Sequence, residues 1–520
     1  MASHTVRQKL PHNLSYFFRR LNSTVPSYTT TAAPPLKSAG KSTSFTFLGN
    51  SQIPISPLPN LEDSSTLPKT AGKPNISSGK PNTATDPVLN LHDSEKLFSS
   101  VSTPKLIKSS ITLQLASAEP MVDFGMWVMN SKFMEIPIIR KMILDVIEYT
   151  FYEHFCAGKN LKEADKTVKR LWDGGLRAML DYGLEHANDN ESCERNLDEF
   201  IQTIESTQTH PVSPVSFVVV KITAICPPIL LKRISDLLRW EYKDKSLHLP
   251  WKLKTFQVFA NSSPLYHTTK RPKPLTIEEE RDFQLAYQRL TKICQKSLQA
   301  NIPLLIDAED TAIQPAIDYF TYSAAIQYHK DDEPLIFNTI QAYLKDAKER
   351  LVIAKRDADK MNVPIGFKLV RGAYMSSERK LASCLGVESP IHEGIQNTHA
   401  CFNECADFML HEIANGSGSV VLATHNIQSG KLAAATASNL GIERDNPKLQ
   451  FAQLYGMAET LSFGLKNAGF RVSKYLPFGP VDQIMPYLLR RAEENRGLLA
   501  TSSLDRQMIR KELIRRLTSK

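Results

Sequence analysis

The sequence predicts an α/β fold, a distorted (βα)8 barrel of the TIM type, with a helical region before it and a disordered leader and linker at its N-terminal end. Three observations lead to this prediction. From about residue 215, short apolar runs recur, each run ends in polar or charged residues, and helical patterns lie between most of the runs. Strands that alternate with helices indicate a parallel sheet. Six or more such units favour a barrel, whose sites lie at the C-terminal face.

The first 61 of the 520 residues hold six basic and no acidic side chains, which accounts for +6 of the formal net charge of +9. Apolar residues between Leu10 and Leu21 recur at helical spacing beside Arg19 and Arg20. An acid-free, arginine-containing N-terminus is typical of a mitochondrial transit peptide, which we place at residues 1–35. A disordered basic tail that carries no targeting signal is the alternative. The rest of the chain is nearly neutral, so its charge predicts no nucleic-acid partner.

Residues 36–115 are rich in Ser, Thr, Pro and Asn, and we expect a disordered linker there because such a segment buries too little apolar surface to become ordered. From about residue 120 the pattern becomes helical. Residues 134–155 carry a buried helical stripe, and residues 160–208 are expected to continue as helices. Residues 116–212 are therefore predicted to form a helical region that packs on the barrel.

The barrel is predicted to span residues 213–505, followed by a basic C-terminal tail at 506–520. Its apolar runs lie at residues 215–221, 303–307, 335–339, 367–371, 419–426 and 449–453. The stretch 232–300 is too long for a simple connection and is expected to be a helical insertion. No early Gly-rich turn follows a strand, so a dinucleotide-binding opening is not supported. The cysteines show no zinc-like spacing, and we expect no metal.

Polar side chains stand at the predicted strand ends. They are Lys221, Asp307, Gln341, Lys368, Arg371, Thr424, His425 and Asn426. Cations and amides that gather at a barrel mouth suit phosphate groups and a flat heterocycle. For any single residue, a solvated strand end is the alternative interpretation.

A second constellation lies near the C-terminus. On a helix, Arg490 and Arg491 follow Tyr487 by three and four residues, and Glu494 follows the same pair by four and three. An adjacent pair of planar, bidentate guanidinium groups can hold a substrate carboxylate. A solvent-exposed Arg/Glu helix is the alternative.

Five motifs in order then resemble the proline dehydrogenase family, over residues 120–505 and most densely after 300. They are Leu369-Val370-Arg371-Gly372-Ala373-Tyr374, Ala423-Thr424-His425-Asn426, Leu454-Tyr455-Gly456-Met457, Tyr475-Leu476-Pro477-Phe478-Gly479 and Tyr487-Leu488-Leu489-Arg490-Arg491. The resemblance implies an FAD-dependent barrel enzyme that oxidises L-proline to Δ1-pyrroline-5-carboxylate, the first step of proline breakdown to glutamate. It further implies ubiquinone as electron acceptor and peripheral association with the matrix side of the mitochondrial inner membrane.

The resemblance also implies roles for single residues. Arg490 and Arg491 would bind the proline carboxylate with Lys221, Glu494 would orient the pair, and Asp307 would lie near the active site. The ring of the substrate would be walled by Tyr475, Tyr487 and Leu454. The residues implied in FAD binding are Gln341, Lys368, Arg371, Gly372, Tyr374, Thr424, His425 and Asn426.

Three other functions compete with this one. A hydroxyproline dehydrogenase would use the same barrel, but the resemblance implies a smaller residue there at the position of Tyr475. A phosphate-binding barrel enzyme without flavin would need a phosphate site after the late strands. A non-catalytic scaffold would have no reason to keep the cations of a carboxylate clamp.

Overall fold

The computed structural model describes residues 88–117, 123, 125, 127–129, 131–184, 186–209, 214–330, 333–497 and 499–518. For residues 116, 117, 133, 209, 492–497 and 499–502 it describes the backbone alone. The predicted transit peptide at 1–35 and the predicted linker up to residue 87 lie outside the described residues.

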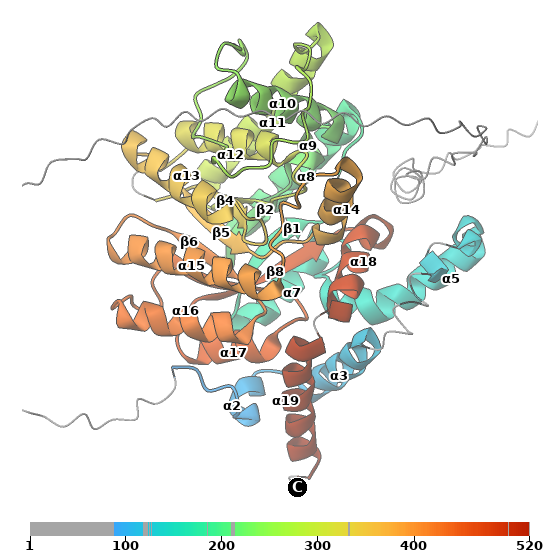
Figure 1. Cartoon of the computed structure of the whole chain (residues 1–520). Helices are drawn as coiled ribbons and strands as arrows, with labels where there is room; N and C mark the ends of the chain where they lie inside the picture. The colour runs from blue at the N-terminus through green and yellow to red at the C-terminus, as the bar shows by residue number, and fades with distance from the viewer. Residues whose placement is uncertain are drawn as a thin grey trace, which may run out of the picture. The chain divides into compact units, whose positions relative to one another are not determined.

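Eight parallel strands close into a barrel in chain order, with β1 hydrogen-bonded to both β2 and β8 (Figure 1). The strands are β1 (Arg177–Tyr182), β2 (Val215–Val220), β3 (Leu304–Ile306), β4 (Ile336–Gln341), β5 (Gly366–Val370), β6 (Val420–Ala423), β7 (Leu449–Leu454) and β8 (Val472–Phe478). The predicted fold class is confirmed. The six runs predicted as strands correspond to β2 to β7.

Helices surround the barrel. Those that follow strands are α8 (Asn190–Ser206), α9 (Ile222–Ile225), α10 (Pro228–Lys243), α11 (Ile277–Ala300), α12 (Gln314–Gln327), α13 (Ala347–Met361), α14 (Met375–Leu385), α15 (Ile395–Ala414), α16 (Ile427–Asn439), α17 (Glu459–Asn467) and α18 (Val481–Gly497). Before β1 lie α2 (Ser94–Phe98), α3 (Thr103–Ser117), α5 (Pro137–Ile147), the π-helical turn η2 (Glu148–Tyr152), α6 (Glu153–Phe155) and α7 (Leu161–Asp173), and α19 (Leu499–Thr518) ends the described chain. None of these helices is both long and apolar enough to cross a membrane.

Four predictions about segments are wrong. The helical stripe over residues 134–155 is not buried as expected, because Ile138, Met142 and Val146 are exposed. Residues 160–208 are not helical throughout, because β1 lies among them and completes the barrel through its pairing with β8. Within the expected linker, residues 88–115 hold α2 and most of α3, whose Leu97, Phe98 and Leu106 are buried. The expected C-terminal tail is part of α19, which packs against α2 and α3.

The contact between the two ends of the described chain has a physical cause. Glu512 of α19 is fully buried and accepts hydrogen bonds from Arg515 and Arg516. Arg516 in turn donates to the carbonyl oxygens of Phe98, the last residue of α2, and of Val101, three residues beyond it, each at 2.7 Å. The Phe98 carbonyl also accepts the Val101 N–H at 2.9 Å, so the guanidinium adds a second donor at the C-terminal end of α2.

An apolar cluster fills the barrel interior. It consists of Met179, Phe217, Val219, Leu305, Phe337, Val421 and Ala452. The rings of Phe217 and Phe337 meet edge to face with centroids 4.7 Å apart. Side chains two residues apart on a strand point to the same side. The residue two positions after each of Met179, Val219 and Leu305 therefore also faces the interior, one layer nearer the C-terminal end.

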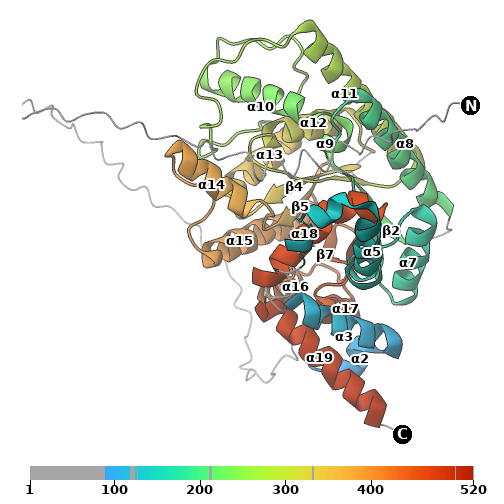
Figure 2. The same cartoon turned by 90° about the vertical axis from the view of Figure 1, so that its right-hand side faces the viewer.

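Two helices lie over that C-terminal end. In Figure 2, α5 and α18 stand in front of the strands, and in Figure 1 both lie on the side of the barrel toward which β8 points. Apolar residues hold them there. The buried members of their shared cluster include Tyr152, Phe155, Ile484, Met485 and Tyr487.

The buried imidazole of His154 in α6 generates a prediction on stability. Its Nε2–H donates to the Gly456 carbonyl at 2.9 Å, and burial lowers the pKa of His154 to about 4 from 6.5. Because the unfolded chain takes up the proton first, this contribution is complete above pH 6.5 and is lost as the pH falls toward 4. The glutamine side chain in His154→Gln keeps a hydrogen-bond donor but does not titrate. Between pH 6.5 and pH 4 we therefore expect the free energy of unfolding to fall by about 3 kcal/mol less in this variant than in wild type.

Denaturant unfolding at pH 6.5 and pH 4 measures this difference. The matched control is His411→Gln, because His411 is exposed on α15. An equal pH dependence in wild type and His154→Gln would contradict the assignment.

Candidate active site

The side chains singled out from the sequence stand at the C-terminal end of the barrel or on the helix that covers it. Lys221 and Asp307 directly follow β2 and β3, Gln341 and Leu454 end β4 and β7, and Lys368 and Tyr475 lie within β5 and β8. Those in the loops after β5 and β6 are Arg371, Gly372, Tyr374, Thr424, His425 and Asn426. Tyr487, Arg490 and Arg491 lie on α18, and the side chain of Glu494 lies outside the described residues.

A buried charge network joins five of the strands, and it consists of Asp181, Lys221, Asp307, Lys368 and Tyr475. The Lys221 ammonium lies 2.7 Å from Asp181 Oδ1 and 3.2 Å from Asp307 Oδ2. The Lys368 ammonium lies 2.5 Å from Asp307 Oδ1. The Tyr475 hydroxyl donates to Asp307 Oδ2 at 2.7 Å and accepts from Lys221 at 3.0 Å. Two lysines thus face two aspartates, and the network has no net charge.

The protonation states follow from these contacts. Burial alone would raise the pKa of Asp307, but the ammonium groups of Lys368 and Lys221 and the Tyr475 hydroxyl hold it below its ordinary value. Burial raises the pKa of Asp181, which the attraction of Lys221 only partly opposes. Burial and the two carboxylates raise the pKa of Tyr475 well above 10. Asp307 is therefore a carboxylate and Tyr475 a neutral phenol at physiological pH, so neither is poised to transfer a proton.

Arg371 has different surroundings. Its guanidinium donates to His399 Nδ1 at 2.9 Å, to Thr424 Oγ1 at 2.7 Å and to Ser429 Oγ at 2.8 Å. Its Cζ lies 4.4 Å from the ring centroid of Phe402. All four partners are neutral, and none of the hydrogen bonds described for Arg371 goes to a carboxylate. Burial lowers the pKa of this group to about 10, so the site favours an incoming anion.

The loops around Arg371 leave room for close approach of the backbone. Gly372 has φ of +141°, and a Cβ there would lie 2.0 Å from the Tyr343 ring. Asn426 is the N-cap of α16, and its side chain accepts from the Ser429 backbone N–H at 2.9 Å.

The Oε1 atom of buried Gln341 has no hydrogen-bond partner among the described residues. A buried acceptor of this kind calls for a donor from a bound molecule.

His425 is a fixed neutral donor. Its Nε2 accepts the backbone N–H of Leu454 at 3.1 Å, which places the ring proton on Nδ1. Burial, followed by the positive charges of Arg491, Lys474 and Arg371, lowers the pKa of His425 to about 3. His425 therefore carries no charge at physiological pH.

An apolar cluster connects α18 with the charge network. Leu454 and Tyr475 both pack against the cluster that contains Tyr487. Arg491 is buried, and its Cζ lies 4.8 Å from the Tyr487 ring centroid, a cation–π contact across one helical turn. Arg490 is half-buried one position earlier. The helix predicted from the Tyr/Arg spacing is confirmed as α18.

Sequence reasoning missed Asp181, His399 and Ser429 as site residues. Asp181 ends the apolar run 178–180, the same rhythm that identified the other strands, so a signal for it was present. The structure pairs Lys368, for which the resemblance implies a role in FAD binding, with Asp307. For His399 and Ser429 no sequence signal points to Arg371.

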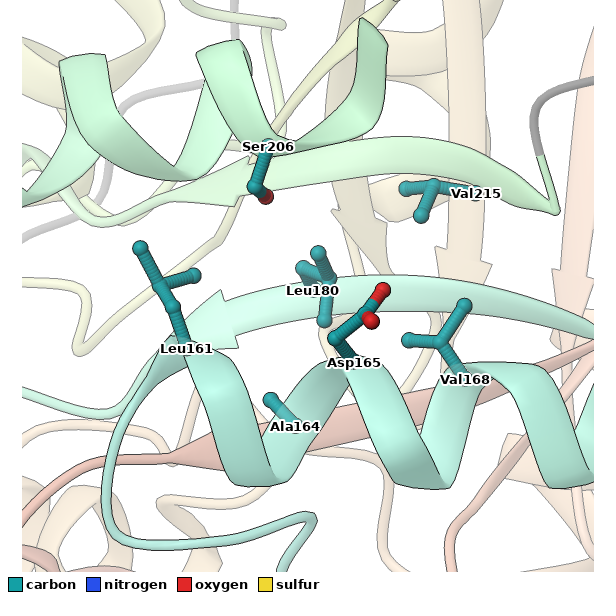
Figure 3. A pocket seen from close by; sticks show the side chains of 7 residues that line it. All are labelled: Leu161, Ala164, Asp165, Val168, Leu180, Ser206 and Val215. Atoms are coloured by element: carbon teal, nitrogen blue, oxygen red, sulfur yellow. The ribbon is translucent and has the colours of Figure 1, made fainter. Parts of the chain in front are cut away.

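The cavity in Figure 3 is separate from this site. It lies between α7, α8 and the strands β1 and β2, and its side chains include Leu161, Asp165, Leu180 and Ser206 (Figure 3). Its volume of about 10 Å³ allows at most one water molecule. Among the residues that the structure describes, no three His, Cys, Asp or Glu side chains are placed to hold a metal ion.

The charge network generates a prediction about Asp181. Asp181→Asn leaves Lys221 buried beside one shared carboxylate, so we expect the free energy of unfolding to fall by about 3–5 kcal/mol. Lys221→Met should cost a similar amount, because it leaves Asp181 buried without its cation. The double variant keeps the neutral Asp307–Lys368 pair, and its loss should be well below the sum of the two single losses. A double-mutant cycle in urea measures this coupling, and additive losses would contradict it.

Comparison with known proteins supplies the family. A family model described as proline dehydrogenase matches residues 164–504. The chain is 56% identical over 432 residues to proline dehydrogenase 2, mitochondrial, of Arabidopsis thaliana, covering 82% of this chain and 91% of that protein. It is 27% identical to the human proline dehydrogenase 1, mitochondrial (73% of this chain, 82% of that one), and 28% identical to bovine hydroxyproline dehydrogenase (79% and 90%).

A solved structure supports the fold. Proline utilization A from Bdellovibrio bacteriovorus, inactivated by N-propargylglycine, is similar with a TM-score of 0.54 at 18% identity. The similar region covers 80% of this chain and 40% of that longer one. The family model spans more than half of the chain, and the Arabidopsis relative is similar over most of both sequences. The chain belongs to the proline dehydrogenase family.

Proposed function

We propose that this protein oxidises L-proline to Δ1-pyrroline-5-carboxylate with FAD as its cofactor. The observation that carries the proposal is the meeting, at one barrel mouth, of the neutral charge network around Tyr475, the arginines of α18 and the guanidinium of Arg371. An amino acid and a flavin dinucleotide both carry anionic groups, and these cations offer separate places for them. Membership of the proline dehydrogenase family supports the same reaction.

The substrate carboxylate would be bound by Arg490 and Arg491, with Lys221 as a third cation. The contact of Arg491 with the Tyr487 ring supports this role, because it holds the guanidinium in one orientation. The aromatic and aliphatic walls would be Tyr475, Tyr487 and Leu454, which pack against one apolar cluster. Glu494 would orient the arginine pair. Binding one end of a five-membered ring in this way fixes where its opposite edge lies, which lowers the entropic cost of reaction.

The side chain of Tyr475, proposed as a wall of the substrate site, is held in place by polar contacts. Its hydroxyl is engaged by Asp307 and Lys221, and the ammonium groups of Lys221 and Lys368 lie 5.7 and 5.4 Å from its ring centroid. We assign Asp307 the task of fixing Tyr475 and both lysines, since it is ionised and fully engaged. The proline nitrogen must be neutral to react, and no described group near Tyr475 is poised as a base. We therefore propose that its proton leaves to solvent.

The residues around Arg371 fit FAD. The guanidinium with neutral partners suits the pyrophosphate, and the unpartnered Oε1 of Gln341 suits a ring N–H. We assign FAD binding to Gln341, Lys368, Arg371, Gly372, Tyr374, Thr424, His425 and Asn426, of which Lys368 would act while paired with Asp307. When bound, FAD would supply the hydride acceptor for the oxidation of proline at C5. His425, neutral with its proton on Nδ1, would present one hydrogen-bond donor.

We further propose that the enzyme is mitochondrial and passes its electrons to ubiquinone at the matrix side of the inner membrane. The basic, acid-free N-terminal segment supports the address, as do the mitochondrial relatives named above. The reaction would begin the conversion of proline to glutamate.

An absorbance spectrum of the purified full-length protein tests the proposal. We expect flavin bands that bleach on anaerobic addition of L-proline and much less on addition of hydroxyproline. Bleaching by hydroxyproline alone would move the protein to hydroxyproline dehydrogenase, an alternative favoured by the similarity to the bovine enzyme. Failure to bind flavin even after FAD is added would refute the proposal.

The substrate choice yields a prediction at Tyr475. A 4-hydroxyl group needs space that the Tyr475 ring occupies, so Tyr475→Ser should raise kcat/KM for hydroxyproline relative to proline by about tenfold or more. Steady-state rates with both substrates and a soluble dye acceptor give the ratio. Tyr475→Phe is the matched control, because it keeps the ring and should leave the ratio nearly unchanged. An unchanged ratio in Tyr475→Ser would remove the steric role of this ring.

A further inference from the structure

An exposed apolar stripe runs along α5 and into η2. Ile138, Met142, Val146 and Tyr149 are 75%, 65%, 63% and 70% exposed. Their spacing of four, four and three residues places them on one face of the helix. We call these four residues the α5 stripe. Scattered exposed apolar residues are ordinary, but four on one helical face form a contiguous patch, which marks an interaction surface.

The opposite face of the same helix packs over the barrel mouth. Ile143, Leu144 and Ile147 pack against the apolar cluster on which Leu454 and Tyr475 also lie. The helix is therefore apolar on two sides, and its outer side lies beyond the C-terminal end of the barrel (Figures 1 and 2). Whatever covers the α5 stripe is consequently brought next to the candidate active site.

The patch extends onto α3. The Lys108 ammonium lies 4.6 Å from the ring centroid of Tyr149 and pairs with Glu153 of α6. On the same helix, Ile107 and Ile111 are 43% and 54% exposed. Two neighbouring helices thus contribute exposed apolar side chains.

The charges around the stripe are balanced. Lys132 and Lys141 are exposed, and so are Glu135 and Asp145. Neither an acidic nor a strongly basic partner is therefore selected, and a partner would be held by apolar contact. The balance predicts that salt weakens the interaction little.

We propose that the α5 stripe docks the protein on the surface of a lipid bilayer, with the helix lying in the interface plane. This inference rests on the proposed function, because the acceptor proposed there is a lipid-soluble quinone. A second copy of the chain fits less well, since stable dimers bury about 800 Å² and 20–30 residues on each partner. The α5 stripe together with Ile107 and Ile111 of α3 offers six exposed apolar residues. A bilayer needs no complementary shape, and it accepts apolar side chains to a depth of about 5–10 Å.

Docking in this orientation would turn the barrel mouth toward the lipid. The inner face of α5 would then wall the active site while the outer face is immersed in the membrane interface. Electrons would leave the site on the side where a membrane quinone is present, without release of the protein from the surface.

The test compares full-length wild type with Ile138→Ser/Met142→Ser/Val146→Ser in sedimentation with phosphatidylcholine vesicles that contain ubiquinone. We expect the triple variant to lose vesicle binding by about tenfold or more, given the apolar area removed from lipid. Its reduction of ubiquinone in the vesicles should fall in parallel. Its rate with proline and a water-soluble dye should match that of wild type, because the substituted side chains face away from the mouth.

The matched control is Ile229→Ser/Ile277→Ser, which removes two isoleucines that are 72% and 88% exposed on α10 and α11. It should bind vesicles as wild type does, at low and at high salt. Vesicle binding by the triple variant at the wild-type level, or no binding by wild type, would overturn the proposal. A drop in molecular mass of the triple variant without vesicles would assign the stripe to a second copy instead. Absence of dye reduction by wild type would refute the proposed function, while the binding comparison would still report on docking.

Discussion

Two lysines and two aspartates are buried at the C-terminal end of the barrel. Removing the counter-charge of any one of the four would lower the free energy of unfolding. A buried ion without a partner costs several kcal/mol, so the network fixes the positions of β1, β2, β3 and β5 relative to one another. The hydroxyl of Tyr475 adds β8 to this set. The charged residues Asp181, Lys221 and Asp307 face inward because each follows an interior residue of the apolar cluster (Met179, Val219 or Leu305) by two positions. The charge network is thus the upper boundary of the core and the lower boundary of the candidate active site.

The opposite electrostatic arrangement surrounds Arg371. Three hydrogen bonds orient its guanidinium, yet each acceptor is neutral, so the positive charge is oriented but not compensated. A group of this kind is stabilised by an anion that arrives from outside, whereas Lys221 and Lys368 are already paired inside the protein. The two regions of the barrel mouth therefore differ in their electrostatics. The charges of the network around Asp307 compensate one another, whereas the positive charge of Arg371 has no negative partner among the described contacts. The positions of two chemically different ligands could be separated in this way.

The sequence predicts the barrel because apolar runs with polar ends repeat, and β2 to β7 lie where those runs lie. It fails at β1, whose first residue is Arg177 and whose run is short and enclosed by helical patterns. It fails at α2 and α3 because local Ser and Pro content outweighed the few apolar residues that α19 covers. The spacing of Tyr487 and Arg491 is local, so α18 was predictable. The contact between Lys368 and Asp307 is tertiary, and composition and periodicity carry no information about which strand ends touch.

The pairing of β1 with β8 also has a consequence for the order in which the chain can fold. One partner lies near the start of the described chain and the other near its end, so the last ladder of the barrel forms only when almost the entire polypeptide is available. The cap that Arg516 places on α2 adds the same requirement at the extreme C-terminus. Until β8 has been synthesised, one edge of β1 stays open to wrong partners. An incomplete chain of this barrel is therefore more exposed to aggregation than the complete one.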